Sequence, residues 1–337
     1  MKKQELQFKN GKFRALFLSD LHTVVNFDRR LTRDIDAILS KYNPDIVLLN
    51  GDIVWRDASE SKDALKGVLT ELDKCITAHN IPWAHTFGNH DMEGGCPTSV
   101  QQEVYESFEH CLSKRSAEGV EGVMNYVLPV KSTDGKKVAF NLWAFDSGRG
   151  YHEFLSSYGV DTSDKFFLNM PDPLHLSQGY DALRFTQMMW YWNESVRFEQ
   201  ENGGKVPGVM FFHIPFPEYT IPYRNVMQTK YSGTRREGVG CSPINSGMFA
   251  TLIQRGDVKT VICGHDHIND YEGTYLGIKL TYDGGISYDC YCDEDIRGGR
   301  IIDVDESDPW NIKTYMVRAA DCVENYPGEE MRCNASE

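Results

Sequence analysis

The segment "FRALFLSDLH", residues 13–22, opens a regular alternation of apolar runs and helical patterns. Its apolar run, like those in "DIVLLNGD" at 45–52 and "IPWAHTFGNHD" at 81–91, is short, which is typical of a buried strand. Between these runs, residues 28–42 and 61–80 carry apolar side chains at helical spacing. This strand–helix–strand–helix–strand order predicts parallel strands with helices packed on the sheet.

Beyond residue 122 the chain becomes richer in strands. "GVMNYVLPV" at 122–130 and "KKVAFNLWAFDS" at 136–147 flank a polar turn, which predicts a β-hairpin. Further strands are expected at 208–213 and 258–267, and residues 277–318 are β-rich. Helices are predicted over 99–116, 181–200 and 246–255.

Two long segments, 148–180 and 214–243, lack periodicity and are rich in loop-forming residues. Loops of this length inside a compact domain are usually functional or mobile. Neither an internal repeat nor a low-complexity linker interrupts the sequence. We therefore predict one domain over residues 1–320 and a polar tail over 321–337.

The composition narrows the range of partners. The 337-residue chain has a formal net charge of −14 and a pI near 5.2, so its surface repels phosphate backbones and anionic lipid. We expect neither a nucleic acid polymer nor a membrane as partner. The sequence holds no apolar stretch of about 18 residues and no signal-peptide pattern, so a cytoplasmic location is expected.

Nine cysteines are scattered along the chain, an odd number that favours reduced, buried thiols over a disulfide framework. The pair at 290 and 292, in "CYC", could in principle bind a metal ion. Two cysteines at this spacing more often mark one face of a strand, which is the interpretation favoured here.

Polar side chains follow five of the predicted strands, each at the point where the apolar run ends. They are Asp20 and His22, Asp52, Asn89 with His90 and Asp91, His213, and His265 with His267. Any one of them alone would more simply be a helix cap, a turn residue or a core histidine. Because the carboxyl ends of the strands in an open α/β sheet line the ligand-binding crevice, their joint occurrence predicts one site.

Carboxylate, imidazole and amide groups without thiolate suit divalent cations such as Mn, Fe or Zn. Seven candidate ligands are too many for one transition ion, and fit two ions that share a bridging carboxylate. Two ions about 3.5–4 Å apart can hold both oxygens of an in-line displacement at phosphorus and acidify a bound water. The sequence therefore predicts a binuclear metal centre.

The series "DLH", "GD", "GNHD", a histidine at a strand end and "GHDH" resembles the calcineurin-like metallophosphoesterase superfamily over residues 13–318. "HIPFPEY" at 213–219 and "NSGMF" at 245–249 look more specifically like a subgroup related to purple acid phosphatases. The resemblance implies an α/β fold, a four-layer α/β/β/α sandwich of two mixed β-sheets flanked by helices.

The resemblance also implies a role for each candidate residue. Asp20, His22 and His267 would hold the first ion, Asn89, His213 and His265 the second, and Asp52 would bridge them. The implied enzyme is a di-metal phosphoric ester hydrolase, most simply a phosphomonoesterase of small phosphorylated substrates, with a metal-bridging hydroxide as nucleophile. His90 would act as general acid, and Asp91 would orient its ring.

One position departs from the purple acid phosphatase pattern. Those enzymes carry a tyrosine ligand three residues after the bridging aspartate, whereas this chain has Trp55 there. The substitution puts a ferric–tyrosinate site in doubt and favours two divalent ions.

Two alternatives remain at this stage. The chain could be a phosphodiesterase acting on small or cyclic nucleotide diesters, or a catalytically silent scaffold with the same fold. The presence of His90 argues against the scaffold hypothesis, because a scaffold needs no proton donor. The sequence does not identify the substrate pocket. Candidates such as Asp146, Ser147, Glu218 and Tyr219 are more simply interpreted as solvated loop residues.

Overall fold

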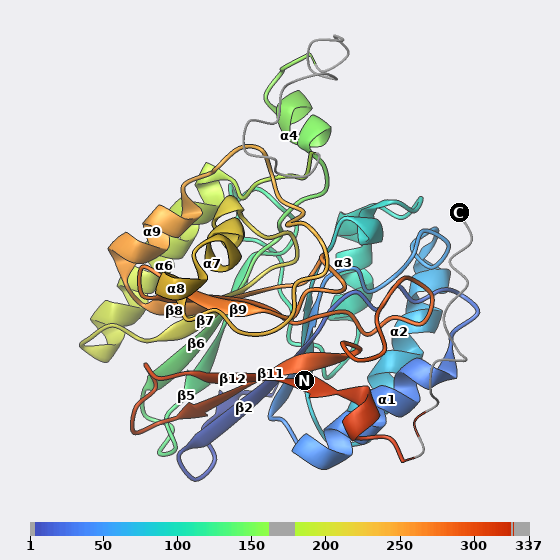
Figure 1. Ribbon diagram of the computed structural model, residues 1–337, viewed down its shortest axis with the longest axis horizontal. Coiled ribbons are helices and arrows are strands. Elements are labelled where there is room, and N and C mark those ends of the chain that lie inside the picture. The colour runs from blue at the N-terminus through green and yellow to red at the C-terminus, as the bar shows by residue number, and fades with distance from the viewer. Residues whose placement is uncertain (1–3, 162–178, 325, 327–337) are drawn as a thin grey trace.

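The strands of the computed structural model, which describes residues 4–161, 179–324 and 326, form two mixed sheets (Figure 1). The smaller sheet has the order β12-β11-β2-β3-β4. Its strands are β2 (Lys12–Leu18), β3 (Ile46–Asn50), β4 (Trp83–Thr86), β11 (Gly298–Asp305) and β12 (Lys313–Arg318). Strands β2, β3 and β4 are parallel neighbours, which confirms the alternation predicted for the first 90 residues.

The larger sheet has the order β1-β5-β6-β7-β8-β10-β9. Its strands are β1 (Leu6–Gln7), β5 (Tyr126–Lys131), β6 (Val138–Ala144), β7 (Gly208–Phe211), β8 (Val258–Cys263), β9 (Glu272–Tyr275) and β10 (Ile278–Tyr282). Strands β5 and β6 pair antiparallel, as the predicted hairpin requires, while β6, β7, β8 and β10 run parallel.

Helices cover the outer faces of both sheets, and Figure 1 shows the two groups on opposite sides of the strands. Beside the smaller sheet lie α1 (Arg29–Tyr42), α2 (Lys62–Thr77) and α3 (Thr98–Glu106). Beside the larger sheet lie α6 (Phe185–Asn202) and α9 (Met248–Arg255), with the short helices α7 (Ile221–Arg224) and α8 (Val226–Thr229). Phe17 of β2 meets Phe211 of β7 with ring centroids 5.5 Å apart, so the sheets face each other. The expected sandwich is confirmed.

Helix α3 is shorter than the helix predicted over 99–116. The chain leaves the helix after Glu106 and pairs with the edge of the smaller sheet instead. Trp83 N–H donates to the His110 carbonyl, and Leu112 N–H donates to the Trp83 carbonyl. These hydrogen bonds pair backbone groups of the edge strand β4 that would otherwise lack a partner strand. The helical periodicity of the sequence does not predict them.

The two aperiodic segments contain little regular structure among their described residues. The first holds α4 (Tyr151–Ser157), and residues 162–178 of it lie outside the described part of the chain. Most of the predicted tail at 321–337 also lies outside, so its boundary stays a prediction. The cysteines in the described residues form no disulfide, as expected. Over the same residues, no helix combines the length and apolar character that a bilayer span demands.

Candidate metal centre

Four of the predicted ligands occupy an unusual backbone conformation. Asp20, His22, Asp52 and His265 have φ angles of 52°, 47°, 47° and 77°. The left-handed region is uncommon for residues other than glycine, and such outliers concentrate at functional sites. The sharp turns follow β2, β3 and β8 directly. They turn the polar side chains inward at the carboxyl ends of the strands.

Glycines let the backbone approach these side chains closely. A Cβ atom at Gly88 would lie 2.1 Å from Asp52 Oδ1, and one at Gly51 would lie 2.6 Å from the His213 imidazole. Neither position has room for a side chain, because a non-bonded contact this short is repulsive. The glycines of "NGD" and "GNHD" therefore have a packing role at the site.

One group of potential ligand atoms comes from Asp20, His22, Asp52 and His267, all buried and all within 4.8 Å of one another. His22 Nε2 lies 3.1 Å from His267 Nε2, and His267 Nε2 lies 3.3 Å from Asp20 Oδ1. His22 Nε2 is also 3.7 Å from Asp52 Oδ2. The structure thus brings together residues from three strand ends in two different sheets.

A second group comes from Asp52, His213 and His265, whose ligand atoms also lie within 4.8 Å of one another. His213 Nε2 lies 3.0 Å from Asp52 Oδ2. Asn89 is 7% exposed and follows β4, the neighbour of β3. Asp52 belongs to both groups, which is the arrangement that a bridging carboxylate requires.

Charge interactions in the centre are strong. Burial raises the pKa of Asp52, but the surrounding imidazoles have the larger effect. Of these, His213 contributes most, and together they hold the pKa of Asp52 well below its usual range. Burial lowers the pKa of His213, but Asp52 and Asp20 outweigh burial and raise it to about 10. Burial lowers the pKa of His22 and of His265, which favours the neutral imidazole that binds metal ions.

Several buried atoms make no hydrogen bond to any part of the chain that the structure describes. They include Asp20 Oδ1, Asp52 Oδ2, Asn89 Oδ1, His213 Nε2 and the Nδ1 atoms of His22 and His265. Unsatisfied buried polar groups are costly, and these six atoms belong to the predicted ligands. Carboxylate, amide and imidazole donors clustered in this way fit a pair of divalent cations.

Neighbouring groups orient the imidazoles. His213 Nδ1 lies 2.9 Å from the Asn50 carbonyl, and His267 Nδ1 lies 2.7 Å from the Tyr291 carbonyl. A ring that donates from Nδ1 to a carbonyl presents Nε2 as the free lone pair. In both residues Nε2 is the atom that faces Asp20 or Asp52.

His90 and Asp91 do not interact as the resemblance implies. Asp91 is buried, and its carboxylate accepts hydrogen bonds from the N–H groups of Ile53, Val54 and Gly88. Burial and the charge of Asp52 raise the pKa of Asp91 to about 7.

The His90 ring instead has Nδ1 3.1 Å from Glu93 Oε1. Glu93 is thus the acidic neighbour of the ring among the described residues, and the orienting role of Asp91 stays a prediction. Both Asp91 oxygens are occupied by the turn that carries the ligands. The i,i+3 spacing of His90 and Glu93 in "HDME" was the available sequence signal.

Two aromatic rings border the centre. Trp55, at the position of the tyrosine ligand in the related pattern, lies with its ring centroid 4.4 Å from that of His22 and 4.6 Å from that of His90. Tyr180 lies edge-on to His265 at 4.1 Å. A bridge to Gly150 places Tyr180 there, and sequence reasoning missed it because the surrounding segment has no periodicity.

The other loop candidates have structural partners rather than solvated positions. Ser147 is buried and accepts a hydrogen bond from Ile214 N–H, next to His213. Tyr219 is fully buried and donates to the Val261 carbonyl. Glu218 accepts a hydrogen bond from Asn245. Interpreting Ser147 and Tyr219 as solvated residues was wrong, because both pack beneath the site.

Asp146 is buried too, and accepts a hydrogen bond from Val123 N–H. It lines a hollow of about 220 Å³ together with Met92, Arg149 and Arg184. Met92, in its wall, follows His90 by two residues in the chain.

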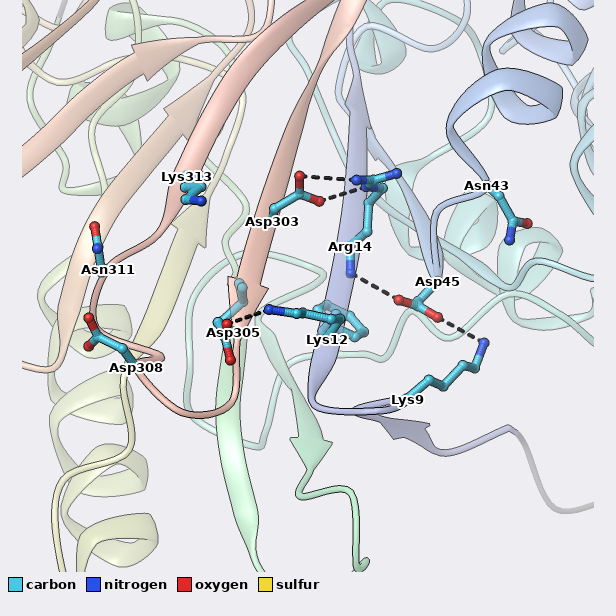
Figure 2. A pocket seen from close by; sticks show the side chains of 12 residues that line it. Lys9, Lys12, Arg14, Asn43, Asp45, Asp303, Asp305, Asp308, Asn311 and Lys313 are labelled. Carbon is cyan, nitrogen blue, oxygen red and sulfur yellow. Dashed lines mark hydrogen bonds and ion pairs between the residues drawn. The ribbon is translucent and has the colours of Figure 1, made fainter.

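A different hollow, of about 680 Å³, lies at the opposite end of β2 (Figure 2). Three of its cations are paired with acids: Lys9 lies 2.8 Å from Asp45, Lys12 contacts Asp305, and Arg14 lies 2.6 Å from Asp303. Figure 2 shows these pairs along the wall. Neutralised in this way, the hollow offers little net field for a phosphate group.

Comparisons with known proteins agree with this geometry. The family profile described as calcineurin-like phosphoesterase matches residues 13–269. "Probable inactive purple acid phosphatase 29" of Arabidopsis thaliana is 31% identical over 320 residues, covering 86% of this chain and 76% of that protein. "Phosphatase DCR2" of Saccharomyces cerevisiae is 28% identical over 308 residues, covering 82% of this chain and 48% of that protein.

Among solved structures, a dimetal phosphatase from Danio rerio superposes with a TM-score of 0.54 at 16% identity. The match covers 87% of this chain and 92% of that one. At 16% sequence identity, this structural similarity shows that the two proteins share a fold.

Proposed function

The chain belongs to the calcineurin-like phosphoesterase family, and from that premise we propose that it hydrolyses phosphoric esters with two divalent cations. We further propose that its substrates are small phosphomonoesters. One observation carries the proposal: Asp52, fully buried, is shared by two groups of potential ligands drawn from both sheets. A site that only tightened the fold would need one ion, whereas displacement at phosphorus is helped by two.

We assign the ligands in accordance with these groups and add Asn89 from the family resemblance. Asp20, His22 and His267 would hold one cation, Asn89, His213 and His265 the other, and Asp52 both. Cations in these positions supply Lewis acidity, which lowers the pKa of water and offsets phosphoryl charge. The chain itself supplies orientation, because the Nδ1 atoms of His213 and His267 face backbone carbonyls.

His90 is proposed as the general acid. Its side chain is 29% exposed, so a substrate can reach it, and its ring lies 5.1 Å from that of His22. Glu93 lies beside Nδ1, which leaves Nε2 as the candidate donor. The proton passes from His90 to the oxygen of the departing alcohol as the P–O bond breaks.

A non-catalytic role is the second candidate. Three relatives from Arabidopsis thaliana carry names that begin "Probable inactive purple acid phosphatase", whereas the yeast relative is named a phosphatase. Trp55 supports a non-catalytic role, because it replaces the tyrosine of the purple acid phosphatase pattern. The ligand set and His90 support catalysis, because a scaffold needs neither.

The test is to measure metal content and hydrolysis on the same preparation. Nitrophenyl phosphate, bis-nitrophenyl phosphate and cyclic nucleotides separate monoesterase from diesterase activity, with Mn²⁺ or Zn²⁺ added. We expect two cations per chain and a preference for the monoester. A preparation that binds both cations and hydrolyses none of these compounds supports the scaffold.

A further inference from the structure

The irregular segment between β10 and β11 carries a thiol to the metal centre. The Sγ of Cys290 and one ring nitrogen each of His22 and His267 lie within 4.8 Å of one another. The interpretation of "CYC" as one face of a strand is therefore wrong, because residues 290–292 are not part of a strand. We propose that Cys290 is a thiolate ligand of the cation held by His22 and His267, and that it biases this position towards Zn²⁺ over Mn²⁺.

The chain on both sides of Cys290 is fixed to this part of the centre. Trp55 Nε1 donates to the Asp289 carbonyl at 3.3 Å, and the Trp55 ring packs on His22. On the other side, the Tyr291 carbonyl faces His267 Nδ1 at 2.7 Å. The Tyr291 ring stacks on the His267 ring with centroids 4.1 Å apart and planes 4° apart. These contacts hold the thiol beside both imidazoles.

A further contact anchors the segment to the loop at 214–243. Tyr291 Oη donates to Glu237 Oε2 at 2.9 Å, and Glu237 Oε1 accepts from Ile268 N–H, next to His267. The segment is thus tied to the centre by Trp55, His267 and Glu237 together. Its position does not depend on a single weak interaction.

Buried unsatisfied atoms around the same imidazoles indicate that a cation belongs there. Asp20 Oδ1 and Asp52 Oδ2 make no hydrogen bond within the described residues. Asp20 Oδ1 lies 3.3 Å from His267 Nε2, and Asp52 Oδ2 lies 3.7 Å from His22 Nε2. His22 and His267 belong both to the group with the thiol and to the group with these carboxylates, so they link Cys290 to the proposed cation. The assignment rests on the proposed centre but not on hydrolysis.

The distances allow ligation after a small adjustment. Zinc–sulfur and zinc–nitrogen bonds of about 2.3 and 2.1 Å keep two ligand atoms of one ion within about 4.4 Å of each other. The Cys290 Sγ and the two ring nitrogens all lie within 4.8 Å of one another, a bound close to that value. When Cys290 binds the cation, its S–H bond is replaced by a metal–sulfur bond and one proton passes to solvent. Thiolate favours Zn²⁺ over the harder Mn²⁺.

Cys292 supplies a matched control in the same segment. Its Sγ donates to the Gly285 carbonyl at 3.3 Å, and it is absent from the group that contains Cys290. Replacing Cys292 by serine changes a nearby thiol to a hydroxyl without removing the thiol at the centre.

The experiment uses the full chain loaded with Co²⁺ and compares Cys290→Ser with Cys292→Ser. We expect a near-ultraviolet thiolate-to-cobalt charge-transfer band in the wild type and in Cys292→Ser, and no band in Cys290→Ser. We also expect the ratio of Zn²⁺ to Mn²⁺ affinity to fall about tenfold or more in Cys290→Ser only. Circular dichroism checks that each variant is folded.

Each other result overturns the assignment. A cobalt-loaded wild type without the band, or a Cys290→Ser protein that retains it, shows that the thiol is not a ligand. An unchanged affinity ratio shows that it does not select zinc. A chain that binds no cobalt at all contradicts the proposed centre as well, whereas a bound cation without the band contradicts the thiolate alone.

Discussion

His213 Nε2 lies 3.0 Å from Asp52 Oδ2, and this pair joins the two sheets at the centre. His213 follows β7 of the seven-stranded sheet, and Asp52 follows β3 of the five-stranded sheet. In the absence of a cation, a proton on His213 balances the Asp52 charge, because its pKa is raised to about 10. A cation bound between these residues would require a neutral His213, so binding would release that proton.

Metal removal is expected to destabilise the fold. At a cation concentration 100 times the dissociation constant, binding contributes about 2.7 kcal/mol, and a chelator removes that contribution. For a chain of this size the loss corresponds to a fall in Tm of roughly 4 °C. Scanning calorimetry with and without chelator measures it. Asp52→Asn should bind less metal and lose most of the chelator effect. An Asp52→Asn protein with the wild-type response would show that Asp52 is not a shared ligand.

His90→Ala is expected to lower kcat by about 10²–10⁴-fold, because the leaving alcohol loses its proton donor. Metal content should not change, since His90 is not among the assigned ligands. His79→Ala is the matched control, because His79 contacts Asp36 on helix α1 rather than the centre. Loss of bound metal in His90→Ala would assign His90 to the ligand set instead.

Glu93→Gln tests whether Glu93 positions the ring of His90. The variant keeps the size of the side chain and removes the charge next to Nδ1. We expect kcat to fall less than in His90→Ala, because a neutral amide holds the ring more weakly than a carboxylate does. Metal content should not change. A kcat equal to that of the wild type would contradict the role.

Gly88→Ala is expected to disrupt the centre, because the added Cβ would lie 2.1 Å from Asp52 Oδ1. The predicted cost is about 1–3 kcal/mol of unfolding free energy, with weaker metal binding. Gly67→Ala in α2 is the control, because no atom lies within 4 Å of its added Cβ. It should be neutral or stabilising by up to about 1 kcal/mol. Urea denaturation distinguishes the two, and equal effects would refute the packing argument.

Asp295→Asn tests an ion pair that holds the loop at 214–243. The hydrogen bond from Arg236 lowers the pKa of Asp295 in the folded protein. The ion pair therefore stabilises the fold above the unfolded-state pKa of about 3.9, and this stabilisation is lost as the pH falls through the folded-state pKa. Because both side chains are partly exposed, we expect Asp295→Asn to lower the free energy of unfolding by about 0.5 kcal/mol at pH 7. The stability difference between wild type and variant, measured from pH 7 to pH 2, should shrink to zero. A difference that grows on acidification would contradict the assignment.

Much of the fold and of the centre could be predicted from local sequence. Short apolar runs that alternate with helical periodicity specify buried parallel strands, and the carboxyl ends of such strands meet at one edge. Asp20, Asp52 and His213 each follow a strand directly, so their convergence depends on topology rather than on fine geometry. The sequence by itself therefore determined the parallel strands with their helices and the candidate ligands at the strand ends, whereas the four-layer sandwich was implied by the family resemblance.

The tertiary structure alone decided which groups touch. Cys290 reaches His22 and His267 from an irregular segment that carries no periodicity, so no local pattern could place it. The choice between Asp91 and Glu93 as neighbour of His90 depended on which backbone N–H groups already occupied the Asp91 oxygens. Contacts of this kind are set by packing between segments distant in the chain, and hydrophobic periodicity reports only on each segment alone.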